Sequence, residues 1–438
     1  MSTYNILVLG SGGREHALAW SLNRSPLLGN LYIAPGNPGT EDFGENIIAL
    51  KPEAYGTPAA WFEAIADLIQ DRDIDLTIVG PEQPLVDGIT DFLESQGHKV
   101  FGPTKAAARL EGSKSFSKWL MAKYNIPTAE SVAFSGKSVL DEVEEYFKAS
   151  DLDWPLVIKA DGLAAGKGVF ICQDQQEAVE HLHRIREDET LRKAASRIIV
   201  EEFMVGEEAS VFAITDGRHA RLLLSAQDHK RIGDGDTGLN TGGMGAYAPA
   251  PVIDKHMLQI VEDTILYPTL GAMQLEGHPY RGVLYLGLMI TDEGPKVVEY
   301  NCRFGDPECQ VLLPAMKSDL LEVMLAAVNF ELEKTEVVMS DDHFCCVVMA
   351  SGGYPGAYAK GMEITGIGDV SGDALVFHSG TRRDGDNLLT NGGRVLSVVS
   401  KGPDLRGAID SCYREVRKIS FDKAYFRSDI GVKGLKRL

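Results

Sequence analysis

The chain has 438 residues, 44% of them apolar and 24% charged; the length suggests roughly two to four domains, and the composition excludes wholesale disorder. The formal net charge of −20 makes nucleic acid and anionic membranes poor partners, because such a surface repels phosphate groups. Six cysteines without a C-x-x-C pair indicate free thiols in a reducing cytoplasm, the opening residues favour a strand over a signal peptide, and no apolar run nears the roughly 18 residues of a membrane span.

The first region alternates apolar strands with helical patterns. Strands are predicted at 5–10, 31–34, 76–80 and 99–103, and this alternation is typical of a parallel, doubly wound sheet. Ligands of such sheets bind at the carboxyl ends of the strands, where this sequence places turns rich in glycine and proline. The candidate substrate-binding residues in these turns are Gly12, Gly13, Arg14, Gly36, Asn37, Pro81 and Glu82.

The first of these turns half matches the dinucleotide fingerprint G-x-G-x-x-G. Its last position is Glu15, however, and the second strand ends in Pro35 rather than in an acid that could hold a ribose, which disfavours NAD. A phosphate at the N-terminus of the following helix, with Arg14 beside it, is the functional interpretation. The structural alternative is a tight strand-to-helix turn in which Arg14 pairs with a nearby acid.

The pattern changes after residue 104. A helical link is predicted over 104–124, and it stops before Pro127. The segments 156–162 and 168–173 flank a glycine-rich turn, as in an antiparallel hairpin. Further strands are predicted at 197–204, 207–215, 220–225, 282–290 and 295–301, followed by a helix at about 318–330 and a strand-rich, glycine-rich tail.

The turn between the two hairpin segments carries three glycines and two lysines. Small residues let backbone N–H groups approach polyphosphate oxygens, and lysine supplies positive charge. It is not a Walker loop, because Gly168 stands where that loop needs Ser or Thr. An ordinary flexible hairpin is the alternative. The candidate phosphate-binding residues are Lys159, Gly162, Gly166, Lys167 and Gly168.

Acidic residues lie at the end of the predicted strand 197–204 and directly after it. Backbone groups at Glu201 and Glu202 could read an adenine edge, with Phe203 packing near the base, and a carboxylate a few residues on could accept hydrogen bonds from ribose hydroxyls. A solvated acidic turn is the alternative, with equal weight if this segment stands alone.

A second polar pattern follows the strand at 295–301. Glu299, Asn301 and Arg303 alternate, so on a strand they would point to one face and aim a carboxylate, an amide oxygen and a guanidinium into one site. Oxygen ligands suit Mg²⁺, which usually takes one or two protein groups and completes its shell with phosphates and water. A half-solvated edge strand is the alternative.

A third polar cluster lies at Asp228-His229-Lys230, near the glycine run around Gly243 that could wrap a ligand. His229 by itself indicates a structural residue rather than a base.

Together these motifs resemble the ATP-grasp superfamily, and within it the phosphoribosylamine–glycine ligase (glycinamide ribonucleotide synthetase) family. The similarity runs in family order over nearly the whole chain. It is carried by GSGGREHALAW, APGNPGT, TIVGPEQPLV, FGPT, LEGSKSF, VIKADGLAAGKGV, EEFMVGEEAS, QDHKR, NTGGMGAYAP, EYNCRFGDPE, ASGGYPG and TNGGRVL.

The resemblance implies an α/β N-terminal domain at 1–103, an ATP-grasp domain at 104–330 with a mobile lid at about 125–190, and a small strand-rich C-terminal domain at 331–438. It implies ATP, glycine and 5-phosphoribosylamine as substrates, Mg²⁺ or Mn²⁺ as cofactor, a cytoplasmic location, and contact with neighbouring purine-pathway enzymes. The nucleotide residues that it implies are Lys114, Lys159, Glu201, Glu202, Phe203 and Glu208, and the metal ligands are Glu299 and Asn301.

The implied reaction phosphorylates glycine and lets the ribosylamine displace phosphate. Arg303, Lys159 and Asp228 are the candidate catalytic residues, and Asp228, Lys230, Gly243 and Arg303 complete the candidate substrate site. Many members of the superfamily carry another metal carboxylate on the preceding strand, where this sequence has Gly287, so a second ion is expected to bind more weakly. The alternatives are a sister ATP-grasp ligase or carboxylase, a dehydrogenase, and a nucleotide-binding regulator.

Overall fold

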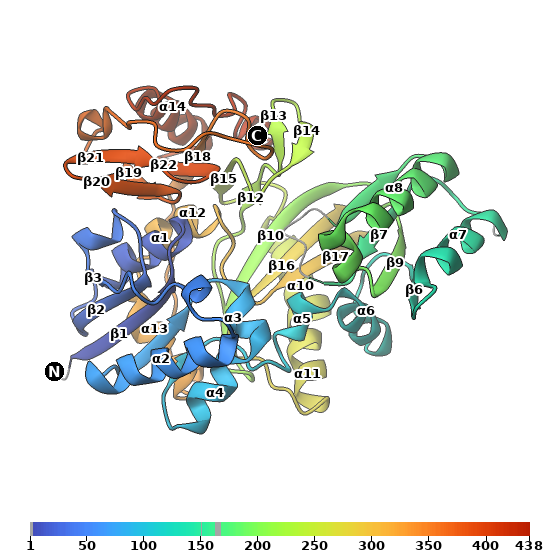
Figure 1. Ribbon diagram of the computed structural model, residues 1–438, viewed down its shortest axis with the longest axis horizontal. Helices are drawn as coiled ribbons and strands as arrows, with labels where there is room; N and C mark the ends of the chain where they lie inside the picture. Colours follow the sequence, from blue (N-terminus) through green and yellow to red (C-terminus); the bar gives the residue numbers. More distant parts are fainter. Residues whose placement is uncertain (1–2, 150, 163–167) are drawn as a thin grey trace.

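The structure, a computed structural model, describes residues 3–149, 151–162 and 168–438. Its N-terminal part contains a five-stranded parallel sheet in the order β3-β2-β1-β4-β5 (Figure 1). The predicted doubly wound sheet is confirmed. Between β4 and β5 the chain forms two short helices, because Gly88 adopts a left-handed conformation with φ 103° between them. The elements are β1 (Tyr4–Gly10), α1 (Gly13–Leu22), β2 (Leu28–Pro35), β3 (Glu45–Asn46), α2 (Pro58–Asp71), β4 (Leu76–Val79), α3 (Glu82–Asp87), α4 (Ile89–Ser95) and β5 (Val100–Phe101).

A second unit, which projects away from the N-terminal sheet at the right of Figure 1, has a four-stranded sheet in the order β6-β9-β7-β8. The predicted helical link is interrupted at Ser113, which caps α6 by accepting a hydrogen bond from the N–H of Phe116. The hairpin predicted around the glycine turn is present as antiparallel β7 and β8. The elements are α5 (Arg109–Gly112), α6 (Lys114–Lys123), β6 (Ser131–Ser135), α7 (Val139–Ala149), β7 (Leu156–Ala160), β8 (Val169–Cys172), α8 (Gln175–Glu187), α9 (Glu189–Ala194) and β9 (Arg197–Glu202).

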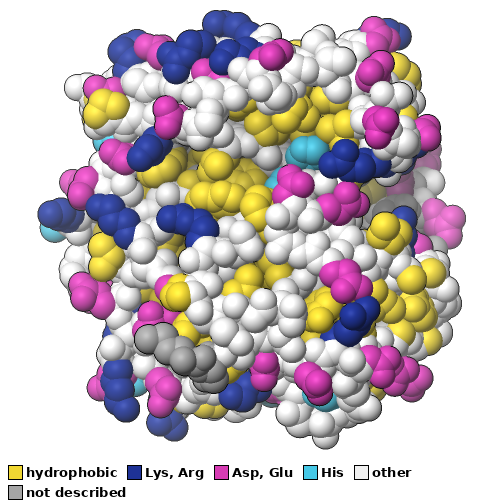
Figure 2. Space-filling view, turned by 90° about the vertical axis from the view of Figure 1, so that its left-hand side faces the viewer, with side chains coloured by type: hydrophobic (Ala, Val, Ile, Leu, Met, Phe, Trp, Pro, Cys, Tyr) yellow, Lys and Arg dark blue, Asp and Glu magenta, His cyan; other side chains and the backbone are white. Residues whose placement is uncertain are grey.

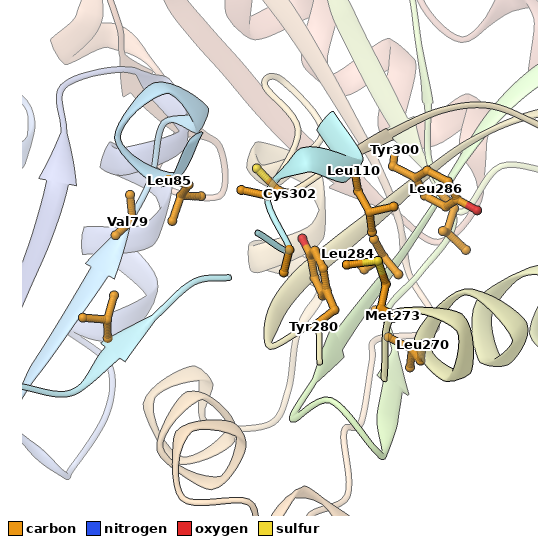
Figure 3. Packing of buried hydrophobic residues seen from close by; sticks show 14 of the residues in the cluster. Val79, Leu85, Leu110, Leu270, Met273, Tyr280, Leu284, Leu286, Tyr300 and Cys302 are labelled. Carbon is orange, nitrogen blue, oxygen red and sulfur yellow. The ribbon is translucent and has the colours of Figure 1, made fainter. Parts of the chain in front are cut away.

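The central sheet, in the order β11-β10-β16-β17, packs against the N-terminal part. Figure 3 shows Leu284 and Leu286 of β16 in a buried cluster with Tyr280, Tyr300 and Met273, while Val79 and Leu85 approach from the N-terminal side. This shared core fixes the carboxyl ends of the parallel strands next to β17. The elements are β10 (Glu207–Thr215), β11 (Ala220–Leu222), α10 (Lys255–Val261), α11 (Tyr267–Leu275), β16 (Gly282–Thr291) and β17 (Gly294–Asn301).

The C-terminal sheet, in the order β12-β15-β18-β22-β19, takes two of its strands from the middle of the chain, since β12 and β15 lie between β10 and β16 in sequence. Helices α12 and α13, placed in the ATP-grasp domain by the boundary at residue 330, share a hydrophobic core with the N-terminal sheet. The elements are β12 (Gln227–Asp228), β13 (Arg231–Gly233), β14 (Thr237–Asn240), β15 (Gly245–Ala248), α12 (Cys309–Ala315), α13 (Leu320–Val328), β18 (His343–Ala350), β19 (Leu375–His378), β20 (Thr381–Asp384), β21 (Asn387–Thr390), β22 (Arg394–Gly402), α14 (Leu405–Val416) and α15 (Val432–Leu435).

The charged side chains, the cysteines and the helix lengths can be compared with what the composition predicted. On the face in Figure 2 acidic and basic side chains are interspersed, so the net charge is not gathered into one acidic area there. All six cysteines are buried and free, as predicted. Within the described ranges no helix is long and apolar enough to cross a membrane.

Candidate active site

Three lysines gather around one buried carboxylate and the edge of the glycine turn. Glu201, on β9 and only 2% exposed, lies 2.8 Å from Nζ of Lys159 and 3.4 Å from Nζ of Lys118. Lys159 also donates to the carbonyl of Val298, and Lys114 donates to the carbonyl of Gly162. We call Lys114, Lys118 and Lys159 the lysine cluster. It concentrates positive charge beside the strands β7 and β17.

Burial favours the neutral form of two lysines of this cluster, Lys118 and Lys114. It lowers the pKa of Lys118 to about 8, against the opposing effect of Glu201, and it lowers the pKa of Lys114 as well. The carboxylate of Glu201 therefore offsets the mutual repulsion of closely placed cations. An anionic ligand such as a polyphosphate would do the same from the open side.

The two ends of the glycine turn lie among the described residues. Gly162 and Gly168 are described, and the carbonyl of Gly168 accepts a hydrogen bond from the N–H of Ala160. The predicted sites at Gly166 and Lys167 lie outside the described residues.

The predicted adenine segment connects β9 to β10. The side chain of Glu201 pairs with the lysines, and the side chain of Glu202 accepts a hydrogen bond from the N–H of Glu130, so only their backbone groups are left for the predicted adenine contact. Phe203 is 37% exposed, so it is open to a flat ligand. An adenine bound here would have to be read by backbone groups and Phe203, which stays a prediction.

Lys230 links the two acidic positions predicted for ribose and metal. Its Nζ lies 2.9 Å from Glu208 and 3.8 Å from Glu299. Burial opposes the charge of Lys230, but the two carboxylates outweigh burial and raise its pKa. Next to it, burial and the nearby Glu308 carboxylate raise the pKa of Asp228 to about 8.

Glu299 and Asn301 lie on β17 after a bulge that displaces Val298 from the register with β16. Between them, Tyr300 packs into the core (Figure 3), so the two flanking side chains share the opposite face. Lys230, Lys159 and Lys114 outweigh burial and keep the pKa of Glu299 low. Among the described residues no group of three or more His, Cys, Asp or Glu could hold a metal ion.

Arg303 is not part of this strand, which ends at Asn301. The expectation that it aligns with Glu299 on one strand face is wrong, because its guanidinium turns to Glu82 at 3.1 Å and Glu111 at 2.7 Å. Burial opposes ionisation of Glu82, but Arg303 and Arg14 outweigh burial and lower its pKa to about 2. The site thus has a second charged group, which we call the arginine cluster: Arg14, Arg303, Glu82 and Glu111.

Arg14 is buried within this cluster rather than free at a strand end. Its Nε donates to Glu15 at 2.7 Å and its Nη1 donates to the carbonyl of Phe304. Glu15 also accepts from the N–H of Gly12, a group predicted to face phosphate. The pairing alternative therefore describes the contacts of Arg14, and its substrate role stays a prediction.

Two of the other predicted turn residues, Gly13 and Asn37, pack at the junction with the C-terminal sheet. Asn37 donates to the carbonyls of Ser11 and His378, each at 2.9 Å, so it joins two loops instead of facing outward. Gly13 adjoins the side chains of Gln310 and Ser379, Gly36 has φ 73°, and Pro81 is the N-cap residue before α3. None of these contacts tests a role in substrate binding.

Comparison with known proteins identifies the family. The phosphoribosylglycinamide synthetase models match as N domain over residues 4–111, ATP-grasp (A) domain over 112–309 and C domain over 344–433. A phosphoribosylamine–glycine ligase of Chlorobaculum tepidum is 47% identical over 98% of this chain and all of its own. The chain belongs to this ligase family. The family's reaction is the ATP-dependent ligation of glycine to phosphoribosylamine in purine biosynthesis.

The chain is also similar to two solved structures and to a relative that is part of a larger, multifunctional protein. The phosphoribosylamine–glycine ligase of Thermotoga maritima matches with TM-score 0.82 and 34% identity, over 97% of this chain and 100% of its own. A biotin carboxylase domain from Hydrogenobacter thermophilus, 14% identical, matches with TM-score 0.71 over 97% and 92%, which shows the ATP-grasp fold alone. A trifunctional purine biosynthetic protein of Gallus gallus is 46% identical over 98% of this chain, which spans 42% of that protein.

Some residues of the ligase site were missed from sequence. Lys118 lies four residues after Lys114, so the two share one face of α6, and that spacing was the available signal. Glu111 and Glu308 carried no signal, because their partners Arg303 and Tyr285 lie far away in the chain.

Proposed function

We propose that this ligase activates glycine as glycyl phosphate at the lysine cluster and passes it to 5-phosphoribosylamine at the arginine cluster. The observation that carries the proposal is that both clusters adjoin the end of β17. Lys159 donates to the carbonyl of Val298 on β17, and Arg303, two residues after this strand, pairs with Glu82 and Glu111.

The lysine cluster suits the nucleotide. Lys114 and Lys159 would neutralise phosphate charge, and the charge that builds up on the transferring phosphoryl group is stabilised by cations already in place. Glu299 and Asn301 would hold a divalent cation, Mg²⁺ or Mn²⁺, which would supply positive charge that stabilises the phosphate groups.

Phosphorylation solves the chemical difficulty of the substrate. A free carboxylate cannot expel oxide, whereas an acyl phosphate expels phosphate when the amine attacks its carbonyl carbon. The incoming amine is itself the nucleophile, so the protein must supply positioning and exclude water rather than form a covalent intermediate. Burial and the Glu308 carboxylate raise the pKa of Asp228, and the neutral form of this carboxyl would donate a hydrogen bond to an oxygen of the reacting group.

The arginine cluster suits a ribose phosphate. It lies at the carboxyl ends of the parallel strands, where doubly wound sheets bind ligands. Its guanidinium groups are held by carboxylates, which orients them before any substrate arrives. The fusions of relatives to other purine enzymes support contact with neighbouring enzymes of the pathway. A cytoplasmic location is part of this proposal.

The test is phosphate release from ATP with glycine and phosphoribosylamine, each omitted in turn. We expect release only with all three substrates and a divalent cation. Release that persists without phosphoribosylamine at the full rate would refute the coupling, and release with another carboxylate in place of glycine would assign a sister ligase activity.

A further inference from the structure

Two C-terminal segments, A-S-G-G-Y-P-G from Ala350 and T-N-G-G-R-V-L from Thr390, have no part in the function proposed above. In the structure they meet. The N–H of Ser351 donates to the carbonyl of Gly393, and a side chain at Gly393 would strike the ring of Tyr354. Tyr354 from the first segment and Arg394 from the second both contact the turn at Gly242 and Gly243.

Arg394 and Tyr354 hold both polar sides of that turn. The hydroxyl of Tyr354 accepts from the N–H of Gly242 at 3.1 Å, and Nη1 of Arg394 donates to the carbonyl of Gly242 at 2.7 Å. The guanidinium lies so close that a Cβ on Gly242 would be 3.0 Å from its central carbon.

The same guanidinium holds a second segment. Nη1 of Arg394 donates to the carbonyl of Asp306 at 2.6 Å, and Nη2 lies 3.2 Å from the Asp306 carboxylate. Gly243, with φ 113°, presses against this segment, since a Cβ there would be 2.5 Å from Cδ of Pro307. One side chain from β22 therefore sets the spacing between the glycine turn and the segment after β17.

This junction belongs to the arginine side of the site. A Cβ on Gly12 would lie 3.5 Å from the Asp306 carboxylate, which places Asp306 at the end of β1. Burial opposes ionisation of Asp306, while Arg394, Arg14 and Arg303 outweigh burial and lower its pKa. All three cations are arginines, and two of them belong to the arginine cluster.

We propose that Arg394 and Tyr354 are positioning residues that hold the Gly242–Gly243 turn against Asp306, and so set the affinity for the ribosylamine substrate without affecting that for ATP. This role rests on the proposed function, because it assigns the arginine side of the site to the ribosylamine. It gives the C-terminal region a part in substrate selection.

The experiment measures the Michaelis constants of all three substrates for wild type, Arg394→Lys, Tyr354→Phe and the control Arg382→Lys. Lysine keeps the charge but loses the planar fork that spans several acceptors. We expect the constant for phosphoribosylamine to rise about tenfold in Arg394→Lys and about threefold in Tyr354→Phe, as for one or two lost hydrogen bonds, with the other two constants within about twofold. Arg382 pairs with Asp384 at the surface, so the control should match wild type.

The outcomes separate this role from the proposed function. A wild-type enzyme that needs no phosphoribosylamine would refute the proposed function and this role with it. Unchanged constants in an active Arg394→Lys enzyme would refute only the role of Arg394, and equal rises for all three substrates would show a general loosening instead. If Arg394→Lys does not fold, Tyr354→Phe decides, because it removes a single hydroxyl.

Discussion

Burial decides how each charged residue of the site can act. Lys159 and Glu201 are both nearly inaccessible to solvent, and a buried charge is costly without a counter-charge, so each side chain stabilises the other. A ligand must therefore approach from the side that the pair leaves open. Arg303 is likewise committed to two carboxylates. Residues held in this way are oriented before substrate binds, which lowers the cost of reaching the reactive geometry.

Lys159→Ala should slow ATP use by on the order of a hundredfold, about 2–3 kcal/mol, because a cation that stabilises the transferring phosphoryl group is lost. Steady-state kinetics with varied ATP checks this. Lys148→Ala, at an exposed helical pair with Glu144, is the matched control. Wild-type kinetics in folded Lys159→Ala would leave Lys159 with only its structural bond to Glu201.

Glu299→Gln should weaken metal use more than nucleotide binding, because glutamine keeps the shape and one oxygen but loses the charge that a hard cation requires. We expect activity to recover only partly at saturating Mg²⁺, in a titration of rate against metal. Glu293→Gln, at the exposed tip of the β16–β17 turn, should behave as wild type. The metal assignment fails if metal-free nucleotide affinity falls as far as activity.

Arg14→Ala should lower the free energy of unfolding by about 2–4 kcal/mol, because it leaves Glu15 and the Phe304 carbonyl without their buried donor. Chemical denaturation measures this change, and kinetics of the same variant gives the substrate constants. Full stability in this variant would contradict the structural role of Arg14, and a higher Michaelis constant for phosphoribosylamine would support the substrate role that the proposed function gives to the arginine cluster.

At the level of elements, short hairpins and turns around the site depend on contacts from the C-terminal segment. The β13–β14 hairpin follows Lys230 directly and is clamped by Arg427, whose side chain is fully buried. Arg427 binds both oxygens of Asp429, Asp236 of the hairpin and the carbonyl of Arg231. Residues almost 200 positions away in the chain therefore hold the hairpin in place.

Arg427→Met should destabilise the protein by about 2–3 kcal/mol, less than for a wholly buried ion pair, because its carboxylate partners keep some contact with water. Hydrogen exchange should rise at residues 231–240 and stay unchanged in β22. Arg382→Met, in an exposed pair, should change stability by less than about 0.5 kcal/mol. Unchanged exchange in the hairpin would show that other contacts hold it.

At the level of the whole molecule, the N-terminal and C-terminal sheets meet through two buried histidines. Nδ1 of His16 on α1 accepts a hydrogen bond from the backbone N–H of His378 at 2.7 Å, which requires that nitrogen to be unprotonated. Burial lowers the pKa of His16, and burial together with Arg383 lowers the pKa of His378 to about 4. The contact between the two sheets is thus built for neutral imidazoles.

The protein should lose stability as the pH falls from about 6.5 to about 4. In that window the unfolded chain binds protons that the folded chain does not, so the contribution of neutral His378, roughly 3 kcal/mol, is present above pH 6.5 and is lost toward pH 4. Denaturation at a series of pH values measures it. His378→Gln should flatten the dependence, whereas His256→Gln, at an exposed position, should not. An unchanged slope in His378→Gln would contradict the assignment.

Local patterns were sufficient for much of the fold. The parallel sheet, the hairpin of β7 and β8 and the hairpin of β16 and β17 follow from apolar runs and turn residues that lie within a few positions of each other. The motifs at Lys159, Glu201 and Glu299 could also be recognised in the sequence, because the residue types that bind phosphate, nucleotide and metal lie within a few positions of each other in each motif.

Contacts between distant segments were decided only by the tertiary structure. No local pattern pairs Arg14 with the carbonyl of Phe304, turns Arg303 onto Glu82, or brings β12 and β15 into the C-terminal sheet. Each of these contacts depends on how separate sheets pack over a shared core, and packing is a property of the whole arrangement rather than of any stretch of sequence. The sequence by itself therefore determined which chemical groups the enzyme carries, and packing decided which of them face a substrate and which hold one another in place.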